Sequence, residues 1–234
     1  VQDKALVGLA ERHGQIAGWK VGLTTPRMQA LCGVTQPIAG AIFASRIHPS
    51  PATVRAADHV RLGLEFELSF RVGRTPPQGE SQSAETVRRY LDAASASYEV
   101  IDDRNADYGA LDAPSMVADN SWNRGLVLSQ PRPLDELARL TGIRAVLERD
   151  GAEIDTGRSD DVGGDPLSIV AWLANSLAGR GRQLEPGQWI MTGSMIPTRF
   201  AQAGESYRFT LDGFAPVVVE VICSSASRGP GRQS

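Results

Sequence analysis

The strongest constraint in this sequence is the stretch LEFELSFRV at residues 64–72, in which apolar and polar residues alternate. A period of two is typical of a β-strand, because successive side chains point to opposite faces of the sheet. One face then carries only leucine, phenylalanine and valine, and the other carries Glu65, Glu67, Ser69 and Arg71. The stretch therefore predicts a strand with two glutamates on one face.

Two carboxylates on the same face of a strand repel each other unless they face water or share a counter-charge. One interpretation is the solvated outer face of a half-buried strand, a common arrangement in antiparallel sheets. The other is that Glu65 and Glu67 bind a hard divalent cation, which prefers oxygen ligands. The strand alone does not decide between the two interpretations.

Composition excludes several classes of protein. The chain of 234 residues is long enough for one globular domain, and its 24 basic and 27 acidic residues argue against nucleic acid as a partner. Its two cysteines, Cys32 and Cys223, are too few for a disulfide framework and fit a reducing cytoplasm. No apolar run approaches the about 20 residues of a membrane-spanning helix. We therefore expect a cytoplasmic protein that binds neither nucleic acid nor membranes.

The rest of the chain predicts strands mixed with scattered helices. Helices are expected at 3–13, from Pro26 to about Leu31, at about 84–96 and after Asp165-Pro166, and strands at 16–22 and 98–102. Asp-Gly pairs at 150–151 and 212–213 predict tight hairpins, whereas 34–60 is expected to be mostly loop. The mixture indicates an α+β fold with antiparallel or mixed sheets. We expect one domain over residues 1–223, with helix 3–13 as the remnant of a longer N-terminal region, and a disordered tail over 224–234.

The run YEVIDDR at residues 98–104 offers a further carboxylate. Strand parity places Asp102 at the end of an aromatic and apolar face, where a carboxylate is costly unless it is paired or bound to a metal. Arg104 could provide an ordinary ion pair. Together with Glu65 and Glu67, Asp102 would instead complete a set of three oxygen donors that suits Mg²⁺ or Mn²⁺.

Three other segments carry polar groups that could meet a ligand. Lys20 is the one charged residue in GWKVGLTT, where glycines permit close approach of a ligand or another backbone, so Lys20 could contact an anionic substrate group. The alternative interpretation is an ordinary lysine on an edge strand. Asp119 and Asn120 in VADNS have an alternative interpretation as an ordinary turn. Thr192-Gly193-Ser194 predicts either a strand end with a turn or donors at a carboxylate-binding site.

In sequence order, the motifs resemble the 2-keto-4-pentenoate hydratases. They are GWKVGLTTPRMQ, QPIAGAIF, LEFELSF, EVIDDR, VADNS, GDPLSIVAWLANSL and WIMTGS, and the resemblance extends from Trp19 to about Val221. These hydratases belong to the fumarylacetoacetate hydrolase superfamily, as do the 4-oxalocrotonate decarboxylases. The resemblance implies the C-terminal-domain fold of that superfamily, a mixed β-sheet roll or sandwich with helices packed outside. It also implies a homo-oligomer, a Mg²⁺ or Mn²⁺ ion and small 2-oxo acid substrates from the degradation of aromatic compounds.

The resemblance further implies roles for single residues. The implied metal ligands are Glu65, Glu67 and Asp102. The implied catalytic residues are Lys20 and Asp119. The implied substrate-binding residues are Lys20, Asn120, Thr192, Gly193 and Ser194.

The sequence departs from the family pattern at two places near these residues. Asp103 stands where serine is usual, and Arg61-Leu62-Gly63-Leu64 stands where Pro-Arg-[Val/Ile] is typical. An added carboxylate could change metal affinity or the charge of the pocket. We expect a hydro-lyase that adds water to a 2-hydroxy-2,4-dienoate. The alternatives are a 4-oxalocrotonate-type decarboxylase, a carbon-carbon hydrolase of the superfamily and a non-catalytic partner subunit.

Overall fold

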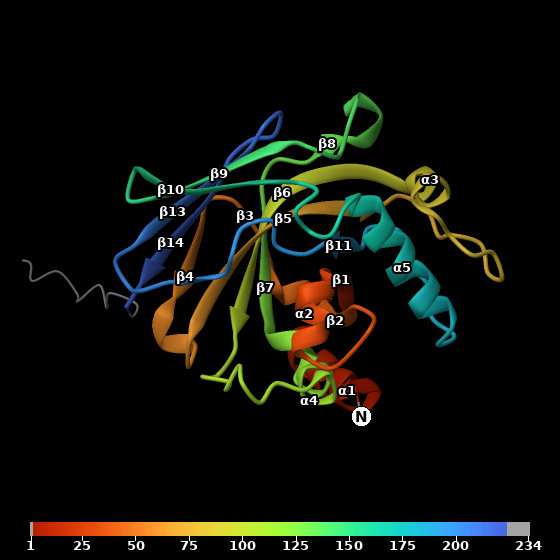
Figure 1. The fold of residues 1–234 in the computed structure, drawn as a ribbon, viewed down its shortest axis with the longest axis horizontal. Helices are drawn as coiled ribbons and strands as arrows, with labels where there is room; N and C mark the ends of the chain where they lie inside the picture. Colours follow the sequence, from red (N-terminus) through yellow and green to blue (C-terminus); the bar gives the residue numbers. More distant parts are fainter. Residues whose placement is uncertain (1, 224–234) are drawn as a thin grey trace, which may run out of the picture.

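Two β-sheets form most of the protein in the computed structural model, which describes residues 2–223 (Figure 1). The α-helices are α1 (Gln2–His13), α2 (Pro26–Leu31), α3 (Ala84–Val87), α4 (Ala113–Ala118) and α5 (Pro166–Ala178). Within residues 2–223, no helix is long and apolar enough to cross a membrane.

The larger sheet has nine strands, in the order β2-β1-β11-β5-β6-β7-β3, with β12 paired to β5 and β8 paired to β6. Its strands are β1 (Ile16–Gly22), β2 (Ile38–Phe43), β3 (Ile47–Pro49), β5 (Leu62–Val72), β6 (Leu91–Asp102), β7 (Asn123–Leu128), β8 (Arg132–Pro133), β11 (Trp189–Met191) and β12 (Arg199–Phe200). The smaller sheet has the order β10-β9-β13-β14-β4. Its strands are β4 (Ala52–Arg55), β9 (Arg144–Arg149), β10 (Ala152–Arg158), β13 (Ser206–Leu211) and β14 (Val217–Ile222).

The long antiparallel pair β5 and β6 runs through the middle of the larger sheet (Figure 1). Its register runs from Leu62 opposite Asp102 to Val72 opposite Leu91. Nearly every residue of both strands is buried. The apolar face of β5 packs on the smaller sheet, where the rings of Phe66 and Tyr98 meet Phe209 of β13 with centroids 5.3 to 6.0 Å apart. These tilted and edge-on contacts join the two sheets.

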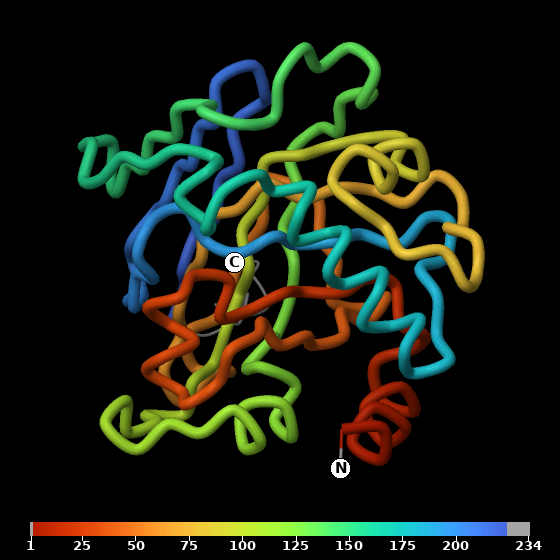
Figure 2. The backbone as a smooth tube through the Cα atoms, turned by 45° about the vertical axis from the view of Figure 1, so that its right-hand side comes forward, coloured from red at the N-terminus to blue at the C-terminus, as the bar shows by residue number. Residues whose placement is uncertain are grey.

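Two helices cover other parts of the sheets. Helix α5 begins at Asp165, whose side chain accepts a hydrogen bond from Leu167 N, and it buries its apolar face in the main core. Figure 2 shows α1 beside the chain that follows α5, where Arg180 Nη2 donates to Gln2 Oε1 at 2.8 Å. This contact holds the first helix against the body of the protein.

Several expectations from the sequence are confirmed. The sheets are mixed, since β1/β11, β3/β7 and β4/β14 are parallel pairs and the others are antiparallel. The Asp-Gly pairs join β9 to β10 and β13 to β14 as hairpins. In the first of them, Asp150 and Gly151 both have positive φ, as tight hairpin turns require. Thr25 caps α2 by accepting a hydrogen bond from Met28 N.

Two expectations are wrong. Residues 34–60 are not mostly loop, because they contain β2, β3 and β4. The helix expected over 84–96 ends at Val87, and β6 begins at Leu91. Alanines and serines in the first half of β6 are permissive of helix, but pairing with β5 buries them between the layers, and tertiary packing overrides local propensity. The tail 224–234 lies outside the described residues.

The aromatic contact between the sheets gives a stability prediction. Phe209→Ala leaves a cavity where Phe66 and Tyr98 meet it, so we expect a loss of about 3–5 kcal/mol in the free energy of unfolding by urea denaturation. The matched control Val7→Ala, at an exposed position of α1, should change it by less than about 0.5 kcal/mol. Equal effects of the two substitutions would show that this contact does not join the sheets.

Candidate active site

Three glutamates meet on one face of the β5–β6 pair. Glu65 lies directly opposite Glu99, and Glu67 is the next residue of β5 on the same face. One carboxylate oxygen from each of the three lies within 4.8 Å of the others. Glu67 is 1% exposed and Glu99 is 0% exposed. The solvated outer face considered as an interpretation of this strand is therefore wrong.

Each carboxylate of this cluster accepts a hydrogen bond from a neighbouring element. The donors are Thr198 Oγ1 to Glu65 Oε1 at 2.7 Å, Gly193 N to Glu67 Oε2 at 2.8 Å, and Asn123 Nδ2 to Glu99 Oε1 at 2.8 Å. The second oxygen of Glu67, Oε1, is buried and has no hydrogen-bond partner among the described residues. The cluster is thus held in place and keeps a free oxygen for a ligand.

Electrostatics in the cluster favours a further cation. Burial, followed by repulsion from Glu99 and Glu65, raises the pKa of Glu67 well above its ordinary value. Burial likewise raises the pKa of Glu99 to about 7, although nearby Lys20 acts to lower it. A single ammonium cannot neutralise three carboxylates. Because all donors are oxygens, the set fits a hard ion such as Mg²⁺ or Mn²⁺.

Lys20 is the cation that the chain itself provides. It lies on β1, is 5% exposed, and places Nζ 3.2 Å from Glu99 Oε2. Burial acts to lower the pKa of Lys20, but attraction from Glu99 and the other glutamates outweighs it and raises that pKa. Lys20 therefore stays charged at neutral pH. The edge-strand alternative is wrong, because β1 lies between β2 and β11.

A cavity of about 910 Å³ opens beside the cluster and is lined by Lys20 and Glu65. Its apolar wall includes Leu23, Met28, Met116, Trp122, Met195 and Ile196. Its polar lining includes Thr24, Thr25, Arg27, Ser121 and Asp161. A cavity of this size with a few convergent polar groups suits a small organic molecule.

The structure does not bring Asp102 to the two glutamates. Its carboxylate accepts hydrogen bonds from the backbone N–H of Val60, Arg61 and Arg104, at 3.0 to 3.1 Å. Burial acts to raise the pKa of Asp102, but these bonds outweigh it and lower that pKa. Asp102 lies three residues beyond Glu99, an odd number, so its side chain points to the other face of β6. The expected place of Asp102 in the cluster is taken by Glu99, and Asp102 instead holds a loop.

Asp119 and Asn120 are also outside the cavity that contains Lys20. Asp119 forms an ion pair with Arg104. Asn120 accepts a hydrogen bond from Ala41 N at 2.7 Å and donates one to Ala41 O at 2.8 Å. Its amide is therefore used to hold β2. The structure does not place either side chain at the expected substrate site.

Thr192, Gly193 and Ser194 lie beside the cluster as expected, but their polar groups serve the chain itself. The Thr192 hydroxyl donates to Leu68 O at 2.7 Å, and the Ser194 hydroxyl donates to Ile196 O at 2.6 Å. Gly193 has a φ of +99°, and a Cβ there would lie 2.8 Å from the Thr24 side chain. A glycine is thus required where the backbone N–H orients Glu67.

Sequence reasoning missed Ser121 as well as Glu99. Asn120, Ser121 and Trp122 form the 3₁₀ turn η4 (Asn120–Trp122), and all three have positive φ, which is costly for non-glycine residues. The Ser121 hydroxyl is buried, lines the cavity and has no hydrogen-bond partner among residues 2–223. A sequence carries little signal for such a backbone, because asparagine tolerates a positive φ at single positions but serine and tryptophan rarely adopt it.

The two departures from the family pattern contact each other. Arg61 Nε donates to Asp103 Oδ1 at 2.7 Å, and a second ion-pair contact joins Arg61 Nη2 to the other carboxylate oxygen. Tyr108, which lines the cavity, donates its hydroxyl to Asp103 Oδ2 at 3.0 Å. The charge of Asp103 is therefore balanced by Arg61 and does not add to the charge of the three glutamates. Asp103 also fixes one wall of the cavity.

Comparison with known proteins shows the family of this chain. Residues 35–222 match the family described as fumarylacetoacetate (FAA) hydrolase C-terminal. A 2-keto-4-pentenoate hydratase of Burkholderia vietnamiensis is 29% identical over 89% of this chain and 79% of its own length. A 4-oxalocrotonate decarboxylase of Pseudomonas sp. strain CF600 is 31% identical over 90% and 79%. The structure of 4-oxalocrotonate decarboxylase from Pseudomonas putida G7, complexed with magnesium and adipate, is similar at 28% identity with a TM-score of 0.86, covering 95% of this chain and 86% of that one.

The position of the third carboxylate can be tested by metal binding. Glu99→Gln removes one carboxylate charge from the cluster, so Mn²⁺ affinity measured by calorimetry should fall by about 100-fold or more. Asp102→Asn should leave the Mn²⁺ affinity nearly unchanged. The exposed Glu153→Gln on β10 controls for loss of one acidic charge. A large loss with Asp102→Asn and none with Glu99→Gln would reverse the assignment.

The raised pKa values predict how metal-free stability depends on pH. A buried carboxyl whose pKa rises from 4.5 to about 7 binds a proton in the folded state that the unfolded state has released. Stability of the metal-free protein should therefore fall as the pH increases through this window, and saturating Mn²⁺ should reduce the fall. Urea unfolding at about pH 5 and about pH 8 measures both slopes. A metal-free protein that gains stability over that interval would contradict the buried cluster.

Proposed function

This chain belongs to the fumarylacetoacetate hydrolase family, and we propose that it is a metal-dependent hydratase that adds water to a 2-hydroxy-2,4-dienoate. The product is a 4-hydroxy-2-oxo acid. The observation that carries the proposal is the buried cluster of Glu65, Glu67 and Glu99 beside a cavity that contains Lys20. Likeness to hydratases and decarboxylases over most of the chain supports it.

The three glutamates would hold Mg²⁺ or Mn²⁺. A divalent ion bound there supplies Lewis-acid stabilisation of negative charge on the oxygen of a 2-oxo acid. Gly193, Asn123 and Thr198 keep the carboxylates oriented through one hydrogen bond each. The enclosed position of Glu67 and Glu99 limits access of water to the cluster.

Lys20 supplies a fixed positive charge at the edge of the cavity. Burial acts to lower the pKa of Lys20, but the glutamates raise it, so Lys20 is suited to bind the substrate carboxylate as an ammonium. The reaction needs a proton at the terminal carbon of the dienol, which gives an α,β-unsaturated 2-oxo acid. Water then adds at the carbon conjugated to the ketone.

The added water needs a polar group in the cavity. Asp119, which the family resemblance implied as a catalytic residue, is ion-paired with Arg104 outside the cavity, whereas Ser121 and Asp161 line the cavity. The unpartnered Ser121 hydroxyl can accept or donate a hydrogen bond to water or substrate. We assign Ser121 to this position in the proposed site.

A 4-oxalocrotonate decarboxylase is the second candidate. Its substrate carries two carboxylates, and Arg27 provides a second cation in the cavity besides Lys20. Loss of CO₂ needs the same stabilisation of negative charge at the 2-oxygen. For both the hydratase and the decarboxylase, we also propose the homo-oligomeric state and the cytoplasmic location expected from the sequence.

A substrate panel separates the two candidates. The protein is incubated with Mg²⁺ or Mn²⁺ and either 2-hydroxypenta-2,4-dienoate or 4-oxalocrotonate, and the products are analysed. We expect loss of the dienoate absorbance and formation of the 4-hydroxy-2-oxo acid. Release of CO₂ from 4-oxalocrotonate, without hydration of the dienoate, would replace the hydratase by the decarboxylase. Inactivity on both, with retained binding to a protein partner, would support a non-catalytic subunit.

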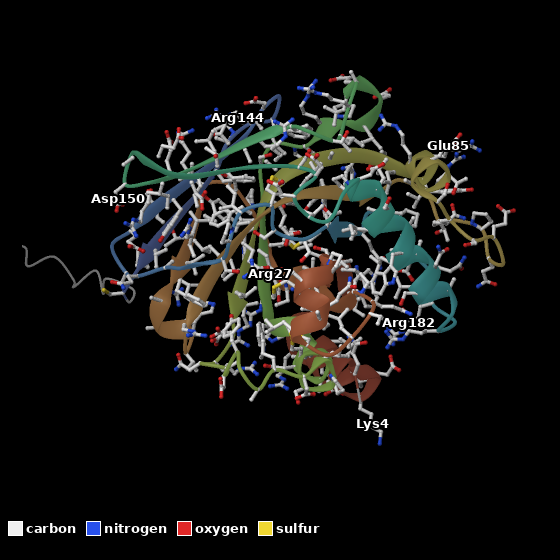
Figure 3. The ribbon with its side chains drawn as sticks, viewed as in Figure 1. Lys4, Arg27, Glu85, Arg144, Asp150 and Arg182 are labelled. Atoms are coloured by element: carbon white, nitrogen blue, oxygen red, sulfur yellow. The ribbon has the colours of Figure 1, made fainter. Side chains whose placement is uncertain are left out.

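The role of Lys20 gives a further prediction. Lys20→Met removes the ammonium at the cavity, so kcat should fall by about 100-fold or more while the circular dichroism spectrum is retained. The other lysine of the chain, Lys4, is exposed and projects away from the fold (Figure 3), which makes Lys4→Met a matched control. Equal activity of the two variants would remove Lys20 from the catalytic machinery.

A further inference from the structure

We propose that a second pocket, separate from the active-site cavity, binds a small dicarboxylate anion. This pocket has a volume of about 310 Å³ and lies between α1, the 3₁₀ turn η1 (Ala44–Arg46), η4 and the start of β7. It shares no lining residue with the cavity that contains Lys20. The inference goes beyond the proposed reaction and does not depend on it.

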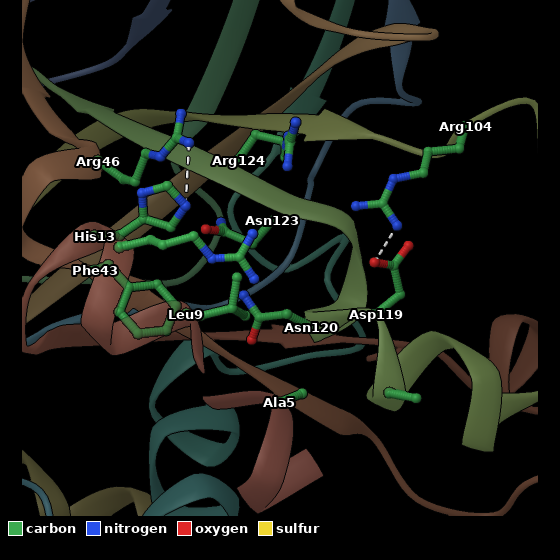
Figure 4. A pocket seen from close by; sticks show the side chains of 12 residues that line it. Ala5, Leu9, His13, Phe43, Arg46, Arg104, Asp119, Asn120, Asn123 and Arg124 are labelled. Atoms are coloured by element: carbon green, nitrogen blue, oxygen red, sulfur yellow. Dashed lines mark hydrogen bonds and ion pairs between the residues drawn. The ribbon is translucent and has the colours of Figure 1, made fainter. Parts of the chain in front are cut away.

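The pocket has an excess of positive charge. Its basic lining residues are Arg12, His13, Arg46, Arg104 and Arg124. Asp119 is the only carboxylate among the lining residues, and it is already ion-paired with Arg104. In Figure 4, Arg46 and His13 lie on one side, the Arg104–Asp119 pair lies on the other, and Arg124 lies between them. Three guanidinium groups therefore lack a carboxylate partner within the pocket.

Close packing of like charges makes this arrangement costly without an anion. Burial together with repulsion from Arg124 lowers the pKa of Arg46 despite attraction from Asp58, and Arg46 Nη2 donates a hydrogen bond to His13 Nε2 at 3.4 Å. Burial, followed by Arg46, Arg12 and Arg124, also lowers the pKa of His13. A bound anion would relieve the repulsion and stabilise the group.

One buried donor in the pocket also lacks a partner. The Nε atom of Arg124 is shielded from solvent and makes no hydrogen bond within the described part of the chain. A buried donor without a partner is unfavourable, because it has lost its hydrogen bonds to water. A planar guanidinium pairs with two oxygens of a carboxylate at once, so a carboxylate would satisfy Arg124 directly.

The remaining wall indicates which anion fits. Ala5, Leu9 and Phe43 give the pocket an apolar side opposite the arginines. A short carbon chain can lie against that side, whereas inorganic phosphate has no apolar part to place there. The pocket is also about a third of the volume of the active-site cavity. These features favour a short dicarboxylate, such as succinate.

The pocket is connected to the candidate metal centre by a continuous segment. Asn120 and Asn123 line the basic pocket, whereas Ser121 and Trp122 between them line the active-site cavity. Asn123 also donates to Glu99 Oε1 at 2.8 Å. An anion that moves Asn123 would thus act on a ligand of the proposed metal.

Calorimetric titration of the metal-free, full-length protein with succinate tests the proposal. Without metal, the three glutamates repel anions from the active site, so saturable binding reports on the basic pocket. Binding should persist in Lys20→Met, which removes the ammonium of the other cavity. It should weaken by about tenfold or more in Arg46→Gln and in Arg124→Gln. Arg12→Gln, at an exposed position of α1, provides a variant with little effect on folding and should also weaken binding.

A control substitution separates binding in the basic pocket from a general loss of positive charge. Arg144→Gln on β9 removes an exposed arginine outside the pocket and should leave succinate affinity within about twofold. Absence of saturable binding, or binding unaffected by Arg46→Gln and Arg12→Gln, would overturn the proposal. Preferential binding of inorganic phosphate would replace the dicarboxylate. If instead the arginine variants change the oligomeric state in sedimentation and succinate does not bind, the pocket accepts an acidic group of another protein copy.

Discussion

The antiparallel register of β5 and β6 is the constraint on which the rest of the site depends. It places Glu65 opposite Glu99 and sets Glu67 beside them, so that three carboxylates meet in a buried position. Burying these charges costs free energy, which Lys20 offsets only in part. A divalent cation bound by the three carboxylates would offset the rest of that cost. The surrounding donors hold the carboxylates ready for that ion.

Other parts of the fold are arranged around this pair of strands. Gly18 lets the backbone of Trp189 approach β1 more closely than a Cβ would permit, and Lys20 lies on the same strand. Gly193 likewise approaches the Thr24 side chain, and its N–H donates to Glu67. The left-handed turn at 120–122 places a hydroxyl in the cavity at a cost in backbone strain. Asp103 and Arg61, where the sequence departs from the family pattern, stabilise each other and position Tyr108. The departures therefore change the cavity wall and leave the cluster unaltered.

Much of the fold and half of the site could be predicted from sequence. Alternation in LEFELSFRV identified the strand and the shared face of Glu65 and Glu67, and the Asp-Gly pairs identified both hairpins. The third carboxylate could not be found in the same way, because it depends on the register between strands far apart in sequence. The expected helix over 84–96 concealed half of β6, so the register that sets Glu99 opposite Glu65 could not be predicted. The positive φ values of Asn120 and Ser121 leave no recognisable pattern either.

The most direct test of this account is a crystal structure of the protein soaked with Mn²⁺, with the ion located by its anomalous scattering. We predict one strong anomalous peak within bonding distance of carboxylate oxygens from Glu65, Glu67 and Glu99, facing the cavity that contains Lys20. A peak at Asp102, or Mn²⁺ bound only at surface carboxylates with the three glutamates empty, would contradict it.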